Sequence, residues 1–234
     1  MKKIFLYAFV FLCSIQWTNA QDSGFIKMEI TEVSSENAEI APFIQMMKGT
    51  QTEYYFTPDK SMVKANMMGG MVEMTTIVGN EDEAMTMYMN AMGNKMQIES
   101  SKEERDKFDE AKNADVPEYT IEYDENVTKE IMGHTCTKAL VTVGEDDAAY
   151  SMVMYVAKDL KASNKMIQGL DKIEIDGFPL EYQMNTAEMN MTITTVEFED
   201  EVASDAFEFN SRGYQKMTWE EFQTKMSQMG GGGF

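Results

Sequence analysis

The sequence predicts a mainly β fold, an antiparallel sheet accompanied by a few short helices. Apolar and polar residues alternate at period two over most of the chain, which is the pattern of strands with one buried face. Turn signals such as Thr57-Pro58-Asp59 and Gly93-Asn94 separate these stretches at short intervals. Neighbouring strands this close must form antiparallel hairpins, because a parallel crossover needs about a dozen residues or more. The expected strands, about eleven in number, cover residues 24–33, 51–56, 62–68, 71–78, 84–92, 95–99, 118–123, 135–143, 150–156, 180–183 and 189–198.

Three stretches change to the helical period. Residues 40–47 carry one apolar stripe at spacings of three and four and are followed by a glycine stop signal. Residues 101–113 open with a capping box from Ser101 to Glu104 but offer only Phe108 and Ala111 as apolar contacts, which is typical of a solvated helix or a flexible connector. The stretch from residue 218 repeats the capping box and places aromatic and methionine side chains along one side. We expect the first of these helices to lie on the sheet through its apolar stripe.

The first twenty residues have the parts of a secretory signal peptide. Lys2 and Lys3 form a positive start, residues 4–12 are apolar, and Thr18-Asn19-Ala20 supplies the small residues of a cleavage site. Cleavage there leaves Gln21 as the new N-terminus, so an exported protein is expected. The sequence leaves open whether it stays in the periplasm, is released outside the cell or associates with the outer membrane.

The expected organisation is a signal peptide at residues 1–20, a single β-rich domain at 21–229 and a flexible glycine-rich tail at 230–234. Beyond the leader no stretch approaches the ~20 apolar residues of a membrane helix, so no transmembrane segment is expected. Cys136 is the only cysteine after the leader. The domain therefore has no internal disulfide, and its stability must come from burial.

The charge balance excludes one class of partner. The chain has 40 acidic and 20 basic side chains, a formal net charge of −20, and only two arginines, Arg105 and Arg212. Nucleic-acid binding needs clustered Lys and Arg that face phosphates. No nucleic-acid partner is expected.

Methionine is unusually common in this chain. Residues 21–234 contain 23 Met and only four Leu, although Leu is ordinarily among the commonest residues. Because side chains alternate along a strand, each period-two set points to one face of its strand. Such faces are interpreted in three ways: a Met-packed core, the lining of a cavity for an apolar ligand, or soft sulfur ligands for Cu(I). The methionines that we predict to line such a cavity are Met85, Met87 and Met89; Met152 and Met154; and Met189 and Met191.

The candidates for catalysis are few. His134 and Cys136 lie two residues apart on an expected strand, and about 6.5 Å separates Cα atoms at that spacing. Cysteine–histidine catalysis needs closer contact and an orienting third group, so we predict no catalytic residue, no cofactor and no enzyme. Zinc and blue-copper sites lack the ligands they require. The one metal alternative is a Cu(I) set of Met85, Met87, Met89, His134 and Cys136.

The order of short motifs resembles a known family. In the first half these are residues 46–50, Tyr54-Tyr55-Phe56, the Met-rich stretch 60–77 and residues 92–96. In the second half they are the strand motif Ile-x-Gly-x-x-Cys-x-Lys-Ala at 131–139, and residues 153–160, 176–182, 205–209 and 213–214. This series resembles exported proteins of the domain of unknown function 4412 family, which is found in Bacteroidetes and is related to the GLPGLI-type proteins.

The resemblance implies more than the strand pattern does. It implies a fold similar to the LolA/LolB lipoprotein-carrier group: a strongly curved antiparallel sheet, or unclosed β-barrel, whose concave face is capped by short helices. It also implies a lipid or lipoprotein partner whose acyl chains lie in that concavity. We therefore expect a non-enzymatic envelope binder of a hydrophobic ligand. The alternatives are a Cu(I)-handling protein and a structural or interaction module of the envelope without a small ligand.

Overall fold

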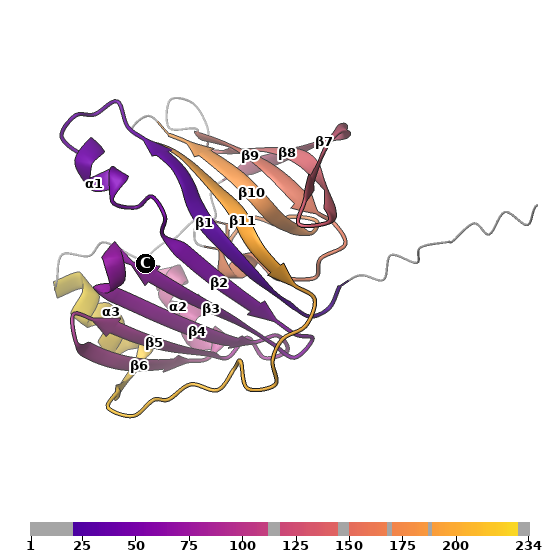
Figure 1. Cartoon of the computed structure of the whole chain (residues 1–234). Coiled ribbons are helices and arrows are strands. Elements are labelled where there is room, and N and C mark those ends of the chain that lie inside the picture. The colour runs from indigo at the N-terminus through magenta and orange to yellow at the C-terminus, as the bar shows by residue number, and fades with distance from the viewer. Residues whose placement is uncertain (1–20, 112–117, 145–149, 168–169, 187–188, 229–234) are drawn as a thin grey trace, which may run out of the picture.

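One continuous sheet of twelve strands makes up most of the computed structural model, which describes residues 21–111, 118–144, 150–167, 170–186 and 189–228 (Figure 1). The predicted signal peptide and the glycine-rich tail lie outside the described residues. The strands are β1 (Gly24–Ser34), β2 (Gln51–Phe56), β3 (Lys60–Met67), β4 (Val72–Gly79), β5 (Met85–Ala91), β6 (Asn94–Ser100), β7 (Tyr119–Ile131), β8 (His134–Val143), β9 (Tyr150–Ala157), β10 (Phe178–Asn185), β11 (Asn190–Glu199) and β12 (Gln215–Thr218).

The strand order is β12-β6-β5-β4-β3-β2-β1-β11-β10-β9-β8-β7. Neighbouring strands pair antiparallel, with the exception of the parallel pair β12–β6. Figure 1 shows that the sheet bends strongly on itself. Within the part of the chain that the structure describes, β12 and β7 end the sheet and do not pair with each other. The predicted fold class, a mainly β protein with a curved, unclosed antiparallel sheet, is confirmed.

All eleven expected strands are present, and the differences have physical causes. β7 continues to Ile131, eight residues beyond its predicted end, where nearly every side chain is exposed. An edge strand that is open to solvent on both faces has no reason to alternate in polarity, so this part of β7 lacks the alternation from which strands were predicted. β12 was not predicted because it has four residues and pairs in parallel with β6 after a long connection.

The three helices are α1 (Ala41–Gln45), α2 (Lys102–Ala111) and α3 (Trp219–Gln228). α1 is shorter than expected, with turns continuing to residue 49. Both predicted capping boxes are confirmed. The Ser101 amide donates to Glu104 Oε2 over 2.8 Å, and the Thr218 amide donates to Glu221 Oε2 over 2.8 Å. These contacts satisfy amides that the first turn of a helix leaves without partners.

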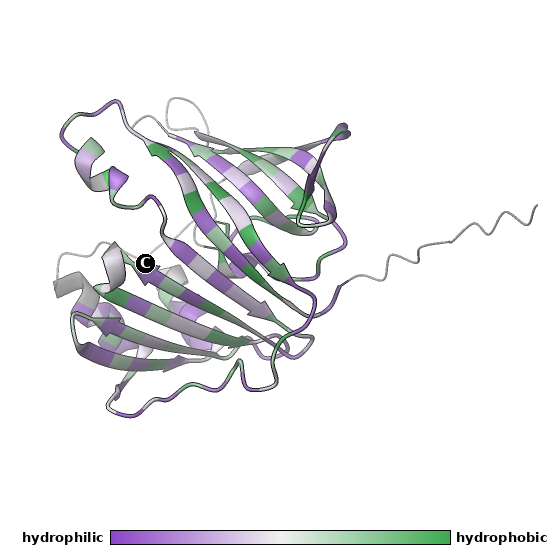
Figure 2. Ribbon diagram, viewed as in Figure 1, coloured by the Kyte–Doolittle hydropathy of each residue, from purple (hydrophilic) through white to green (hydrophobic). Residues whose placement is uncertain are grey.

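Residues that pair across neighbouring strands define the inner face of the sheet. Along each strand, hydrophobic residues alternate with polar ones (Figure 2). On this face, Tyr54 of β2 pairs with Val63 of β3, and the row continues through Thr76 and Met87 to Ile98 of β6. Because directly paired residues point to the same side, this row runs unbroken across five strands. Both hydrophobic clusters of the molecule lie on this face.

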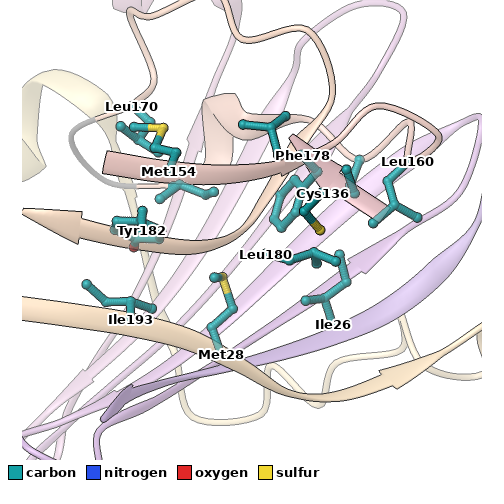
Figure 3. Close-up of a cluster of buried hydrophobic side chains, with 14 of the residues drawn as sticks. Ile26, Met28, Cys136, Met154, Leu160, Leu170, Phe178, Leu180, Tyr182 and Ile193 are labelled. Atoms are coloured by element: carbon teal, nitrogen blue, oxygen red, sulfur yellow. The ribbon is translucent and has the colours of Figure 1, made fainter. Parts of the chain in front are cut away.

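The larger cluster fills the half built from β1, β2 and β7–β11. Figure 3 shows its side chains from several strands pointing toward one another. Met154, Phe178 and Leu180 are fully buried here. The cluster is closed by residues 158–167 and 170–177, which we call the capping segment, through Leu160, Leu170 and other apolar side chains. This half therefore has a conventional filled core.

The ends of the capping segment are fixed to the sheet. The Gln21 amide donates to the Asp159 carbonyl over 2.8 Å, and the Lys161 amide donates to the Gln21 carbonyl over 3.0 Å. At the other end Gly177 has φ +115°, and a Cβ there would lie 2.4 Å from the Ala157 carbonyl oxygen. A larger residue does not fit this close backbone approach.

The smaller cluster lies at the opposite end of the inner face. Phe222 of α3 is 1% exposed and packs with Met87, Met89, Met96 and Ile98 of β5 and β6. On the outer face, residues 200–214 run back across the sheet toward β12, and Phe209 stacks on Tyr88 of β5 at 4.0 Å between ring centroids. The two clusters thus leave the middle of the inner face between them.

Candidate functional site

A cavity of about 720 Å³ lies on the inner face between the two hydrophobic clusters. Its floor is formed by strands β3, β4 and β5. Because strand side chains alternate, the floor takes every second residue of each strand. These residues are Ser61, Val63, Met74, Thr76, Val78 and Met85. Cavities of roughly 300–1,000 Å³ are the usual size of small-molecule sites.

The floor is incompletely covered by the protein itself. Met74, Thr76 and Val78 of β4 are only half-buried, although β4 lies well inside the sheet. Ile26 and Ile98, on the same face to either side, are 0% exposed. On β4 the buried side chain is Thr75, which points to the outer face. The inner face at β4 is therefore only partly packed: Met74 contacts the smaller cluster, and the remaining area of these side chains borders the cavity.

The walls of the cavity come from two separate elements. The first turn of α2 supplies Lys102, Arg105 and Asp106 on one side. The capping segment contributes a second wall, which contains Lys161, Ser163, Lys165, Asp171 and Lys172. The turn between β4 and β5 closes a third side with Asn80 and Glu83. Charged side chains thus surround a floor that is largely apolar.

Glu83 is the electrostatic centre of these walls. Its carboxylate accepts from Lys102 Nζ at 3.0 Å and contacts Lys165 Nζ at 3.5 Å. Arg105 donates to the Glu83 carbonyl and to Ser100. The hydrogen bond from Lys102 is the main reason that the pKa of Glu83 lies below its ordinary value. One carboxylate therefore joins α2 and the capping segment across the cavity.

The seven methionines of the predicted lining have different positions in the structure. Met85 is half-buried and lines the cavity. Met87 and Met89 pack in the smaller cluster against Phe222. Met152 and Met154 are 0% exposed in the larger cluster, and Met191 packs against its edge. Met189 lies in the turn before β11, where its backbone bonds to Thr186. The expected shared faces exist, but only Met85 borders the cavity, and it also packs on one side against the smaller cluster.

The five residues of the Cu(I) alternative are not brought together. Met87 and Met89 belong to the smaller cluster, whereas Cys136 belongs to the larger one. β5 and β8 are separated in the sheet by seven other strands. Among the described residues there is no group of three or more His, Cys, Asp or Glu side chains that could hold a metal ion.

His134 and Cys136 make contacts that belong to packing. His134 Nδ1 lies 2.9 Å from Asp159 Oδ2, and its ring meets the edge of Phe198 at 4.5 Å. The Cys136 thiol donates to the His134 carbonyl oxygen rather than to its ring. Burial raises the pKa of Cys136 to about 12, so its thiolate is strongly disfavoured near neutral pH. His134 thus connects β8 to the start of the capping segment through Asp159 and to β11 through Phe198.

The basic walls were missed in the sequence analysis, although a signal for half of them exists. Residues 158–172 contain four lysines and two acids, in a chain whose acids outnumber its bases two to one. This local reversal marks the capping segment. The other wall gives no such signal, because Lys102 and Arg105 are followed and preceded by several acids on α2.

Comparisons with known proteins leave the family open. No family model matches the chain, and no curated protein matches its sequence. Membership of the domain of unknown function 4412 family thus stays a prediction. Among solved structures, the chain is similar to an uncharacterized conserved protein from Thermus thermophilus, with 10% identity, a TM-score of 0.48 and coverage of 86% of this chain and 92% of that one. It is also similar to LprF from Mycobacterium bovis, with 14% identity, a TM-score of 0.31 and coverage of 79% and 89%.

One further property concerns membranes. Of the helices in the described part of the chain, none is long and apolar enough to cross a bilayer.

Proposed function

We propose that this protein is an exported, non-enzymatic binder of an apolar ligand, held on the inner face of the sheet between the two clusters. The observation that carries the proposal is the half-buried floor of β4 in a cavity of about 720 Å³. Apolar side chains in the middle of a sheet are normally packed, because each buried one contributes about 1.5–3 kcal/mol. A ligand that covers Met74, Val78 and Met85 supplies the missing contacts.

The chemistry of the floor favours an acyl chain over a flat or polar ligand. Met74 and Met85 are unbranched and carry a polarisable sulfur, so they adapt to a flexible partner. Val63 and Val78 add branched apolar contacts with no hydrogen-bonding group. The ligand we propose is a lipid or the acyl part of a lipoprotein. The predicted signal peptide supports a location in the periplasm or outside the cell, where envelope lipids are met.

The first experiment identifies what the protein carries. Protein purified from its own cell envelope is examined by native mass spectrometry and by solvent extraction. A bound acyl-containing molecule is the expected result. Absence of any bound lipid would favour a structural or interaction module instead.

A second experiment locates the binding site with a neutral dye. Thr76→Trp places a large side chain on the floor of the cavity and should abolish the fluorescence increase of Nile red. Thr86→Trp is the matched control, because Thr86 of the neighbouring strand pairs with Ile77 on the outer face. Both variants must first show the circular dichroism and melting behaviour of the folded protein. Equal dye binding by the two variants would contradict a ligand site on this floor.

A further inference from the structure

The charge around the cavity is opposite to that of the chain. The whole sequence has a net charge of −20, with two acids for every base. The residues that line the cavity include five bases and three acids. A quarter of the basic side chains of the protein therefore gather at one site. The bases are Lys102, Arg105, Lys161, Lys165 and Lys172.

The positive charge is only partly neutralised by the protein. Lys102 and Lys165 share the carboxylate of Glu83, at 3.0 Å and 3.5 Å. Lys161 is exposed, and no ion pair of its ammonium group is found within the described residues. It stands on the same wall as Lys165, four residues earlier in the capping segment. The wall thus presents an ammonium group to any anion that enters the cavity.

The apolar floor and the basic walls border one continuous cavity. Met74, Val78 and Met85 lie on the sheet, and Lys102, Lys161 and Lys165 stand on the two elements that flank it. Electrostatic complementarity of this kind selects ligands by their charge more than it raises affinity in general. A neutral ligand would cover the apolar floor and would leave the ammonium group of Lys161 without an anionic partner.

We infer that the ligand is an anionic amphiphile, with its acyl chain on Val63, Met74, Val78 and Met85 and its carboxylate or phosphate head between Lys102, Lys161 and Lys165. This inference rests on the proposed function, since it names the ligand class for the same cavity. Glu83 has a defined part in it. Its carboxylate occupies Lys102 and Lys165 when the cavity is empty and competes with the head of the ligand when the cavity is filled.

The test compares three competitors that share one sixteen-carbon chain. Hexadecanoate, hexadecyl phosphate and hexadecanol are titrated against Nile red bound to the full protein at low ionic strength. The two anions should displace the dye at about tenfold lower concentration than the alcohol, as expected for one charge-assisted contact. Raising the salt to about 1 M shortens the Debye length to ~3 Å and should reduce that preference.

Three variants then assign the preference to residues. Lys161→Gln combined with Lys165→Gln should weaken displacement by the anions about tenfold and leave hexadecanol unchanged. Glu83→Gln should act in the opposite direction, because it removes the competing carboxylate. Lys48→Gln is the control: it removes the same charge from an exposed lysine outside the cavity. Unchanged binding of Nile red shows that each variant is folded.

The outcomes separate the two proposals. If one anion or both displace Nile red at lower concentration than hexadecanol, and the double lysine variant loses this preference, the inference is supported. The anion that is preferred then identifies the head group as a carboxylate, a phosphate or either. Equal displacement by all three competitors overturns the inference and leaves an apolar-ligand site in place. If Nile red does not bind and no competitor has an effect, the proposed function itself fails.

Discussion

The two halves of the inner face use the same strand pattern in different ways. In the half formed by β1, β2 and β7–β11, the capping segment covers the sheet, and Met154, Phe178 and Leu180 are fully buried. In the half formed by β3–β6, α3 packs on β5 and β6, and the floor residues of β4 remain half-buried beside a cavity. Alternation alone does not distinguish a filled core from a binding surface. What distinguishes them is whether another element of the chain packs on top.

The ion pairs of the two halves differ in their exposure to solvent. Lys129 and Glu181 lie on the filled half, where the Glu181 side chain is only 9% exposed. The ion pairs of α2 and the capping segment stand around the open cavity with much larger exposure. The filled half should therefore determine stability, and the open half should determine binding. Four experiments test this comparison.

The largest difference is expected in cysteine reactivity. In protein that begins at Gln21, Cys136 should react with iodoacetamide at pH 8 on the order of a thousandfold more slowly than an unperturbed thiol, because burial raises its pKa to about 12. A thiol placed in the open half by Met74→Cys, in a Cys136→Ser background, should react at an ordinary rate. Mass spectrometry of timed samples measures both rates. Similar rates would show that the two halves are equally accessible.

A pair of identical truncations compares the packing of the two halves. Met154→Ala should lower the free energy of unfolding by about 2–5 kcal/mol, because it opens a void in the filled cluster. Met74→Ala removes the same atoms from the half-buried floor and should cost about 1 kcal/mol or less. Urea denaturation of both variants provides the comparison. A similar loss in both would mean that the floor is packed as tightly as the core.

Removing an ion pair should also lower the free energy of unfolding more in the filled half than in the open half. Lys129 Nζ contacts both carboxylate oxygens of Glu181, at 2.8 and 2.7 Å. Lys129→Met leaves that buried carboxylate with only the 3.5 Å contact from the Thr194 hydroxyl among its described side-chain partners and should cost about 1–3 kcal/mol in the free energy of unfolding. Adding Glu181→Gln should recover part of the loss.

The control for this pair lies on α2. Lys107 and Glu103 form an ion pair whose side chains are 69% and 78% exposed. Lys107→Met should leave the unfolding free energy unchanged within measurement error, since exposed pairs contribute little. Equal effects of Lys129→Met and Lys107→Met would contradict the division of roles.

The smallest expected effect is the pH dependence of Glu83. Its pKa in the folded protein is lowered from the ordinary 4.5, chiefly by Lys102. A depressed folded pKa contributes stability that is present above the unfolded pKa and is lost as pH falls through the folded one. The stability advantage of wild type over Glu83→Gln should thus be constant at neutral pH and decline below about pH 4.5. Thermal melts from pH 7 to pH 3 measure it, and an advantage that grows on acidification would contradict the assignment.

Much of the fold was accessible from local sequence. Residues 24–33 and 51–56 alternate clearly, and the structure places strands there. Ser101 to Glu104 and Thr218 to Glu221 form capping boxes at the two predicted helix starts. These features depend on spacings of two to four residues, which a linear sequence displays directly. β12 lacked such a signal, since the strand it pairs with in the described sheet is β6, more than a hundred residues earlier.

The cavity was not accessible in this way. Its lining combines residues from 61–85, 102–106, 161–165 and 171–172, which only the strand order and the course of the capping segment bring together. Met85 was among the predicted lining residues, and Met152 and Met154 show the same spacing in a filled core. Equal patterns therefore had different outcomes.

The sequence by itself determined that this chain forms an antiparallel sheet with capped helices and methionine-rich strand faces, because periodicity and capping are local properties. Only the tertiary structure decided which stretch of the inner face stays uncovered and which charges surround it. The physical reason is that burial is a property of pairs of elements distant in sequence. The capping segment packs on one half of the sheet and does not extend over the floor on β3–β5. Its lysines lie at the edge of the cavity, opposite those of α2.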